Sequence, residues 1–204
     1  MKSIVILDYG SGNLRSAQRA IEHIGATVEI SADSEKALAA DGLVVPGVGA
    51  FKACMSGITH VNGAEIIGKR SDLKRPVLGI CIGMQVLFTK GLERSTSDSD
   101  ATSGCAIWPG EVAQLRAPVL PHMGWNSVKA GANSQLLAGL DGQSFYFVHS
   151  YAVKESSGLI ESRTAYGESF IAAAEDGVVS ATQFHPEKSG DVGLQLLKNW
   201  VDSL

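Results

Sequence analysis

Hydrophobic residues in the first half of the chain follow two alternating patterns. Short apolar runs, each with the length of a buried strand, occur at 4–7, 28–30, 43–45 and 77–80. Between them, apolar residues recur every three or four positions, which is the spacing of an amphipathic helix, and the clearest case runs from Leu14 to Ile24. We expect further helices at 51–58, 64–73 and 82–89. Alternating strands and helices predict βα units that build a doubly wound, mostly parallel sheet.

Apolar residues in the second half of the chain follow a different pattern. Short apolar strands joined by turns are expected at 145–148, 158–164, 170–173 and 178–184. They predict antiparallel additions to the sheet, and the apolar spacing over 192–201 predicts a closing amphipathic helix. The polar stretch 94–104, RSTSDSDATSG, predicts a mobile surface loop.

Composition narrows the class of protein. The chain has 204 residues, of which 45% are hydrophobic and 19% charged, so we expect a single domain spanning residues 1–204. A formal net charge of -4 favours neither nucleic acid nor an anionic membrane as a partner. The first apolar run is far too short for a signal peptide or a membrane span. Three cysteines without CxxC spacing and five scattered histidines predict no disulfide framework, no metal and no cofactor, and they fit a cytoplasmic location.

A glycine-flanked cysteine lies where the fourth predicted strand meets a helix. The segment 76–85 reads PVLGICIGMQ, which is a nucleophile elbow with Cys81 in the reactive position. Side chains in place of Gly79 and Gly83 would collide with neighbouring backbone, and Cys81 is expected to project from the sheet edge with its sulfur exposed. The start of the following helix would favour the thiolate form. The alternative for this motif alone is a small core residue at a strand end.

A histidine and a glutamate two residues apart follow the last predicted strand. Since residues i and i+2 of an extended chain share a face, Glu187 can orient the ring of His185 and stabilise its charged form. His185 can then exchange a proton with Cys81. The three residues together predict a Cys–His–Glu triad for nucleophilic catalysis.

A glycine-rich turn after the third predicted strand offers a backbone donor. Attack by Cys81 on a side-chain amide creates an oxyanion that needs two N–H groups. We assign these groups to the backbone of Ile82 and of Val48, the latter in the turn Gly47–Gly49. The glycines would allow this peptide to flip and so switch the donor. An ordinary tight turn before a helix is the alternative.

Further blocks extend the pattern over nearly the whole chain. They are PGVGAF at 46–51, PHMGWN at 121–126, YFVHSY at 146–151 and HPEKS at 185–189. With GICIGMQ at 79–85, these blocks resemble the class I, or triad, glutamine amidotransferases, and more narrowly are similar to the glutaminase subunits of imidazole glycerol phosphate synthase. The resemblance implies a flavodoxin-like, three-layer α/β fold with antiparallel additions in its C-terminal half.

The resemblance also implies an activity and a partner. Glutamine would be hydrolysed through a cysteine thioester, and the ammonia would pass through a channel to a (βα)8-barrel cyclase subunit of a heterodimer in histidine biosynthesis. The cyclase would use it on a phosphoribulosyl formimino aminoimidazole carboxamide ribotide. Glutaminase activity would be low until the cyclase binds its ligand.

Matching positions imply roles for individual residues. The triad would be Cys81, His185 and Glu187. Residues that would bind glutamine are Gly49, Gln85, Glu93, His149, Ser150 and Tyr151. Residues that would face the cyclase are Asn13, Met123, Trp125, Tyr146 and Lys188. Glu93 is the nearest acidic match for the group that reads the glutamine amino group, and Met123 and Trp125 could instead belong to the core.

Other functions share this fold and triad. The nearest is the glutaminase of another synthase, such as that for pyridoxal phosphate, whose signature blocks differ from PHMGWN and YFVHSY. A non-catalytic interaction protein, or a thiol sensor using Cys81, is the alternative outside the enzymes. The support that Glu187 gives to His185 argues against a sensor, which needs no oriented base.

Overall fold

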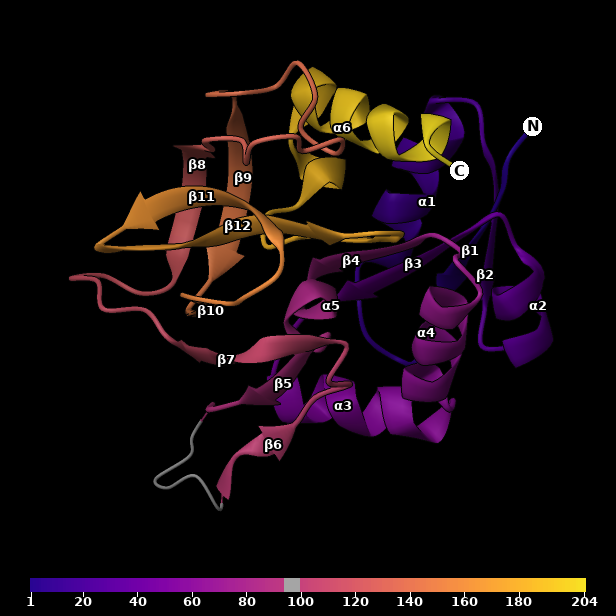
Figure 1. Ribbon diagram of the computed structural model, residues 1–204, viewed down its shortest axis with the longest axis horizontal. Helices are drawn as coiled ribbons and strands as arrows, with labels where there is room; N and C mark the ends of the chain where they lie inside the picture. The colour runs from indigo at the N-terminus through magenta and orange to yellow at the C-terminus, as the bar shows by residue number, and fades with distance from the viewer. Residues whose placement is uncertain (94–99) are drawn as a thin grey trace.

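A seven-stranded mixed sheet forms the centre of the molecule (Figure 1). In this computed structural model, which describes residues 1–93 and 100–204, the strand order is β11-β12-β13-β4-β3-β1-β2. The parallel strands are β1 (Ser3–Leu7), β2 (Thr27–Ser31), β3 (Gly42–Gly47), β4 (Val77–Cys81) and β13 (Val179–Thr182). The antiparallel strands at one edge are β11 (Ile160–Tyr166) and β12 (Glu168–Asp176). The parallel part has the strand order of flavodoxin-like folds, as predicted.

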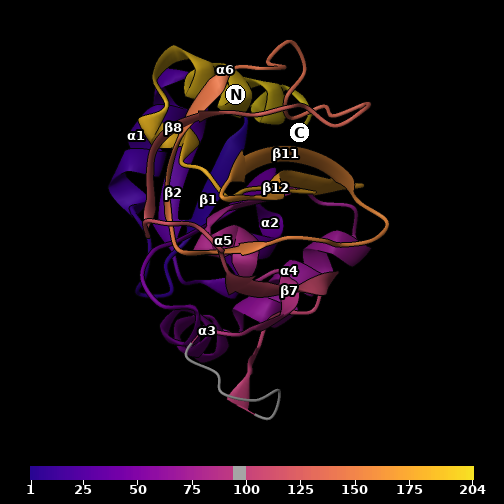
Figure 2. The ribbon, with the colours of Figure 1, turned by 90° about the vertical axis from the view of Figure 1, so that its left-hand side faces the viewer.

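Helices cover both faces of this sheet and make the fold three-layered. Figures 1 and 2 show α1 (Leu14–His23) and α6 (Gly190–Asp202) on one face. The opposite face carries α2 (Ser34–Ala39), α3 (Phe51–His60) and α4 (Gly63–Asp72). Every residue of β3 and β4 is buried, because a central parallel strand with helices on both sides has no exposed face.

Two smaller sheets lie beside the carboxyl ends of the parallel strands (left in Figure 1). One has the order β10-β7-β5-β6, with bounds Tyr151–Val153, Trp108–Gln114, Phe88–Gly91 and Thr102–Ser103. The other pairs β8 (His122–Ser127) with β9 (Ser144–His149). No helix of the described residues is long and apolar enough to cross a membrane.

Several sequence expectations are corrected here. The helix expected over 82–89 is only α5 (Ile82–Gln85), because the buried run that follows enters β5 at Phe88, and a continuous apolar run has no period to separate helix from strand. The strand at 145–148 pairs with β8 and not with the central sheet. The strand expected to reach 184 ends at Thr182. Of the predicted loop 94–104, residues 94–99 lie outside the described residues, and Thr102–Ser103 form β6.

Candidate active site

The cysteine elbow is a strained turn between β4 and α5. Cys81 has φ 59° and ψ -114°, a left-handed conformation that L side chains rarely adopt. A Cβ atom on residue 83 would overlap the carbonyl oxygen of Val45, and one on residue 79 would press on the backbone of Gly83. Glycine is therefore required at both positions, because Gly83 packs directly against β3 and Gly79 packs against the backbone of the following turn.

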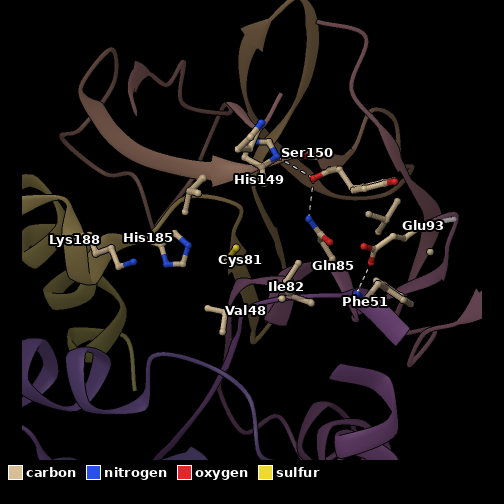
Figure 3. A pocket seen from close by; sticks show the side chains of 16 residues that line it. Val48, Phe51, Cys81, Ile82, Gln85, Glu93, His149, Ser150, His185 and Lys188 are labelled. Atoms are coloured by element: carbon tan, nitrogen blue, oxygen red, sulfur yellow. Dashed lines mark hydrogen bonds between the residues drawn. The ribbon is translucent and has the colours of Figure 1, made fainter. Parts of the chain in front are cut away.

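Cys81 is buried, which corrects the expectation of an exposed sulfur. Its exposed fraction is 3%, because the two small sheets and their loops cover the edge where β4 ends. The side chain lies at a cavity of about 310 Å³, at the small end of the range for ligand pockets (Figure 3). Most residues singled out from the sequence line this cavity: Val48, Gly49, Cys81, Ile82, Gln85, Glu93, His149, Ser150, Tyr151, His185 and Lys188.

His185 and Glu187 are joined by a buried hydrogen bond. The Nδ1 atom of His185 lies 2.8 Å from Oε1 of Glu187, and both side chains are 2% exposed. The expected geometry was wrong in one respect: β13 ends before this pair, and Glu187 lies in a 3-10 turn, η2 (Pro186–Lys188). The 3-10 turn, and not the alternation of side chains along a strand, brings the Glu187 carboxylate to Nδ1 of His185. The second ring nitrogen, Nε2, has no hydrogen-bond partner among the described residues.

The charge on His185 is set by two opposing effects. Burial lowers the pKa of His185, whereas Cys81 and the Glu187 carboxylate raise it, and the net result is a pKa of about 9 against an ordinary 6.5. An imidazolium with the Glu187 carboxylate on one side and the Cys81 sulfur on the other is thus the favoured form of His185 at neutral pH.

The backbone of Val48 does not lie as expected for an oxyanion donor. Its N–H donates to Oγ of Ser11 over 3.3 Å, and the Ser11 hydroxyl donates back to its carbonyl oxygen over 2.8 Å. The Cys54 thiol donates to the same oxygen over 3.4 Å. Gly49, next in the chain, has φ 91°, so the turn has the freedom that a peptide flip needs. Ile82 is the first residue of α5, and the first N–H groups of a helix have no acceptor within that helix.

Gln85 is held on the side of Cys81 opposite His185 (Figure 3). Its Nε2 donates to the carbonyl of Tyr151 over 2.8 Å and to Oε1 of Gln183 over 2.9 Å. Both amide hydrogens are therefore used inside the protein, and its own oxygen is the atom left for a ligand.

The ring of His149 lines the cavity but is engaged within the protein. Its Nδ1 lies 2.9 Å from the Tyr151 carbonyl and its Nε2 lies 3.0 Å from Nδ1 of His122. Burial lowers the pKa of His149 to about 3, so the ring is neutral. A direct hydrogen bond from this ring to glutamine, which the resemblance allowed, is not available in this arrangement.

Glu93 lies across the cavity at the start of α3. Its Oε2 accepts a hydrogen bond of 2.7 Å from the N–H of Phe51, the first residue of that helix. A carboxylate is favoured there by the helix dipole and the free N–H groups. Among the described residues, no hydrogen bond engages the other carboxylate oxygen, which could therefore meet a cationic group in the cavity.

The residues predicted to meet a partner are exposed or half-buried. Met123 and Trp125 are 62% and 59% exposed, so the alternative that placed them in the core was wrong. Tyr146 is half-buried, and its ring lies 6.1 Å from that of Trp125 and 6.0 Å from Nζ of Lys188. Asn13 is half-buried and is the N-terminal cap of α1.

Comparison with known proteins agrees with this geometry. The profile for glutamine amidotransferase class-I matches residues 5–204. The chain belongs to the class-I glutamine amidotransferase family. Within that family it is 56% identical over 207 residues to imidazole glycerol phosphate synthase subunit HisH of Mycolicibacterium paratuberculosis, with 100% of this chain and 98% of the relative covered. HisH of Nocardia farcinica is 57% identical over 212 residues, covering 100% of this chain and 99% of the relative.

Solved structures of more distant relatives support the fold. A structure titled as a glutamine amidotransferase is 16% identical, with a TM-score of 0.75, and covers 97% of this chain and 98% of its own. PurLQS from Thermotoga maritima is also 16% identical, with a TM-score of 0.72 and coverage of 100% and 99%. The predicted class-I fold, with a mostly parallel sheet and antiparallel C-terminal strands, is confirmed.

Sequence reasoning missed residues that this amidotransferase site uses. Neither Gln183 nor Ser11 was singled out from the sequence, and His122 was noted only as a member of the block at 121–126. A polar residue such as Gln183, next to the apolar end of a strand, is itself a signal, since a buried amide needs partners. No group of three metal-ligating side chains occurs among the described residues.

Proposed function

We propose that this chain is the glutaminase subunit of an imidazole glycerol phosphate synthase, and that residues 1–204 act as one amidotransferase domain. It would hydrolyse glutamine to glutamate and ammonia and deliver the ammonia for histidine biosynthesis. The observation that carries the proposal is the cavity that contains Cys81 opposite a His185–Glu187 pair. It occurs in a chain that is 56% identical to HisH proteins over its full length.

The first step is attack of the Cys81 thiolate on the side-chain amide carbon of glutamine. A C–S bond forms and the carbonyl electrons move to oxygen, which gives a tetrahedral oxyanion. When the oxyanion collapses the C–N bond breaks, and the imidazolium of His185 gives its proton to the departing nitrogen. Ammonia leaves, and an acyl thioester remains on Cys81.

Water completes the reaction. Neutral His185 takes a proton from a water molecule while the oxygen of that water attacks the thioester carbon. Collapse breaks the C–S bond and restores the thiolate and the imidazolium, and the product carboxylic acid ionises to glutamate. The carboxylate of Glu187, 2.8 Å from Nδ1, would stabilise the His185 ring at each step where the ring is charged.

The oxyanion needs donors on the cavity side of Cys81. The N–H of Ile82, which directly follows the nucleophile at the start of α5, would supply one of them, and the N–H of Val48 would join it after the Gly47–Val48 peptide turns away from Ser11. The present bonds to Ser11 support a low resting activity, because the second donor is occupied. Partner binding would favour the turned peptide.

Glutamine would lie between the two ends of the cavity. Its amino group would meet the free oxygen of Glu93, whose other oxygen is fixed by Phe51. The side-chain amide of glutamine would reach Cys81, and Gly49, Gln85 and the Ser150–Tyr151 segment would form the walls of the cavity around it.

The partner would be a (βα)8-barrel cyclase that consumes the ammonia on its ribotide substrate. Exposed Met123 and Trp125, with Tyr146, Lys188 and Asn13, would form the docking surface. Large apolar side chains exposed beside a polar site are typical of such surfaces. The cysteines at 54, 81 and 105 are all free thiols, which suits a reducing compartment such as the cytoplasm.

The decisive experiment measures glutamate release from glutamine by this chain, alone and with its cognate cyclase barrel and a bound ribotide. Strong activation by the liganded barrel is expected. High activity that the barrel does not change would move the chain to another glutaminase system. No activity in either condition would favour a sensor or an interaction protein.

Cys81→Ala separates chemistry from structure. The variant is expected to abolish glutamine-dependent synthesis by the complex while the cyclase still uses added ammonium. Loss of the ammonium reaction as well would assign Cys81 a structural role only. Alkylation of Cys81 by 6-diazo-5-oxo-norleucine, a glutamine analogue, would further separate a glutaminase pocket from a thiol sensor.

A further inference from the structure

A buried amide side chain, to which neither the motif nor the mechanism above gives a role, contacts the nucleophile. Gln183 follows the last residue of β13 and is 1% exposed. Its Nε2 lies 3.8 Å from Sγ of Cys81, within hydrogen-bonding distance for sulfur. We propose that Gln183 is a further catalytic residue, whose amide N–H donates to the Cys81 sulfur and stabilises its thiolate form. This inference rests on the proposed function of Cys81 as the nucleophile.

The orientation of this amide follows from its neighbours. The carbonyl of Tyr151 can only accept, so the Gln85 atom 2.8 Å away must be the NH2 group. That NH2 group lies 2.9 Å from the Gln183 side chain, which must therefore present its oxygen there. The remaining end of the Gln183 amide, its NH2 group, then faces Cys81. The direction of each hydrogen bond is thus determined by one backbone carbonyl.

The carbonyl of Tyr151 also meets the ring of His149. Since a carbonyl only accepts, Nδ1 of His149 must carry a hydrogen, and in a neutral ring Nε2 is then the acceptor. Nδ1 of His122, 3.0 Å away, therefore donates to it. His122 is itself held between the rings of Phe147 and Tyr166, with centroids 4.9 and 4.1 Å away. A chain of buried hydrogen bonds thus supports the amide that meets the sulfur.

A thiolate at this depth needs such a donor. Cys81 is 3% exposed, so a charge on its sulfur has little contact with water. α5 is only four residues long, so its dipole is a small source of stabilisation. His185 supplies a positive charge, and the Gln183 amide supplies a hydrogen-bond donor that does not give up its proton during the reaction. A hydrogen bond to a charged group changes an equilibrium constant by about ten- to a hundredfold.

The test is the pH dependence of Cys81 alkylation by iodoacetamide, which needs no glutamine. Gln183→Met preserves length and removes the donor. We expect its rate at pH values below both midpoints to fall about tenfold, with an unchanged plateau at high pH, where every sulfur is ionised. The midpoint of the profile would rise by about one pH unit. Superimposable profiles would overturn the inference, and so would a lower plateau without a shift of the midpoint.

Controls isolate the effect. Gln195→Met makes the same change on the exposed side of α6 and should leave the profile unchanged. Cys81→Ala gives the background of the other thiols, whose pKa values burial raises, to about 11 in the case of Cys105. If Gln183→Met does not fold, Gln85→Leu tests the same support. It should shift the midpoint in the same direction by a smaller amount, and no shift would refute the inference.

The failure of this inference differs from the failure of the proposed function. A wild-type Cys81 that reacts no faster than background, in a protein that releases no glutamate with its liganded partner, would refute both. A reactive wild type whose profile Gln183→Met leaves unchanged would refute only the role of Gln183.

Discussion

Replacing Ser11 with alanine is expected to raise the glutamine hydrolysis that this chain performs without a partner. Ser11 accepts a hydrogen bond from the N–H of Val48 over 3.3 Å, which holds the Gly47–Val48 peptide, and donates to the carbonyl of Val48 over 2.8 Å, which belongs to the next peptide. A solvent-accessible hydrogen bond contributes roughly 0.5–1 kcal/mol. Loss of the bond to the N–H would shift the equilibrium of the Gly47–Val48 peptide by about 0.5–1 kcal/mol, or about two- to fivefold, towards the state that lends its N–H to the oxyanion. The 3.4 Å contact from Cys54 to the Val48 carbonyl remains in the variant and continues to hold the next peptide.

The assay for this prediction is steady-state glutamate release with and without the liganded barrel. The rate without a partner should rise in Ser11→Ala, whereas the fully activated rate should stay near wild type, because there the peptide has already turned. Ser16→Ala, the same exchange within α1, is the matched control and should change neither rate. An unchanged rate without a partner, in a Ser11→Ala variant of normal thermal stability, would mean that Ser11 does not restrain the donor.

Three further predictions concern charge, stability and substrate. Because the pKa of His185 is raised from 6.5 to about 9, the imidazolium stabilises the fold below pH 6.5, and this stabilisation is lost as the pH rises through 9. Glu187→Gln should lower the midpoint of the His185 titration measured by NMR, and an unchanged midpoint would contradict the pairing. Arg70 is fully buried and donates to backbone carbonyls at the end of α2 and to that of Pro76, just before β4. Arg70→Met should therefore cost about 3 kcal/mol in urea unfolding, and a loss below about 1 kcal/mol would contradict this reasoning. Glu93→Gln should raise KM for glutamine about tenfold or more with little change in kcat, and an unchanged KM would remove Glu93 from the amino-group site.

The parallel core could be predicted because its signals are local. Each of β1, β3 and β4 is a short apolar run that helices bury on both faces, and α1, α3 and α4 carry their own amphipathic spacing. The elbow was also readable, since two glycines around Cys81 are needed wherever a strand, a sharp turn and a helix meet. These features depend on residues close together in the sequence.

The cover over the site could not be predicted, because it depends on long-range pairing. β5 pairs with β7 in parallel, and β10 joins β7 from about forty residues further along the chain. Nothing in the run 86–91 distinguishes an edge strand from the continuation of a helix. The burial of Cys81 follows from this cover, which is why the sulfur was expected at the surface.

Polar networks were the other part beyond reach of the sequence. The partners of Ser11 lie 37 and 43 residues away, and Gln85 meets Gln183 across 98 residues. A motif shows that a residue type recurs in a block, but the direction of an amide depends on which carbonyl it meets in the folded chain.

The β8-β9 ribbon links the two surfaces that the proposed function requires. His122 pairs with His149 and Trp125 with Tyr146 in one register. Because alternate residues of a strand face opposite sides, the two histidines are buried in the hydrogen-bond network near Cys81, whereas Met123 and Trp125 are exposed on the surface proposed for docking. A slip of one residue would exchange these sides, so the register needed for docking is also the register needed for the site. A partner that moved the ribbon would therefore act on the Tyr151 carbonyl, and through it on the amides that orient towards the nucleophile.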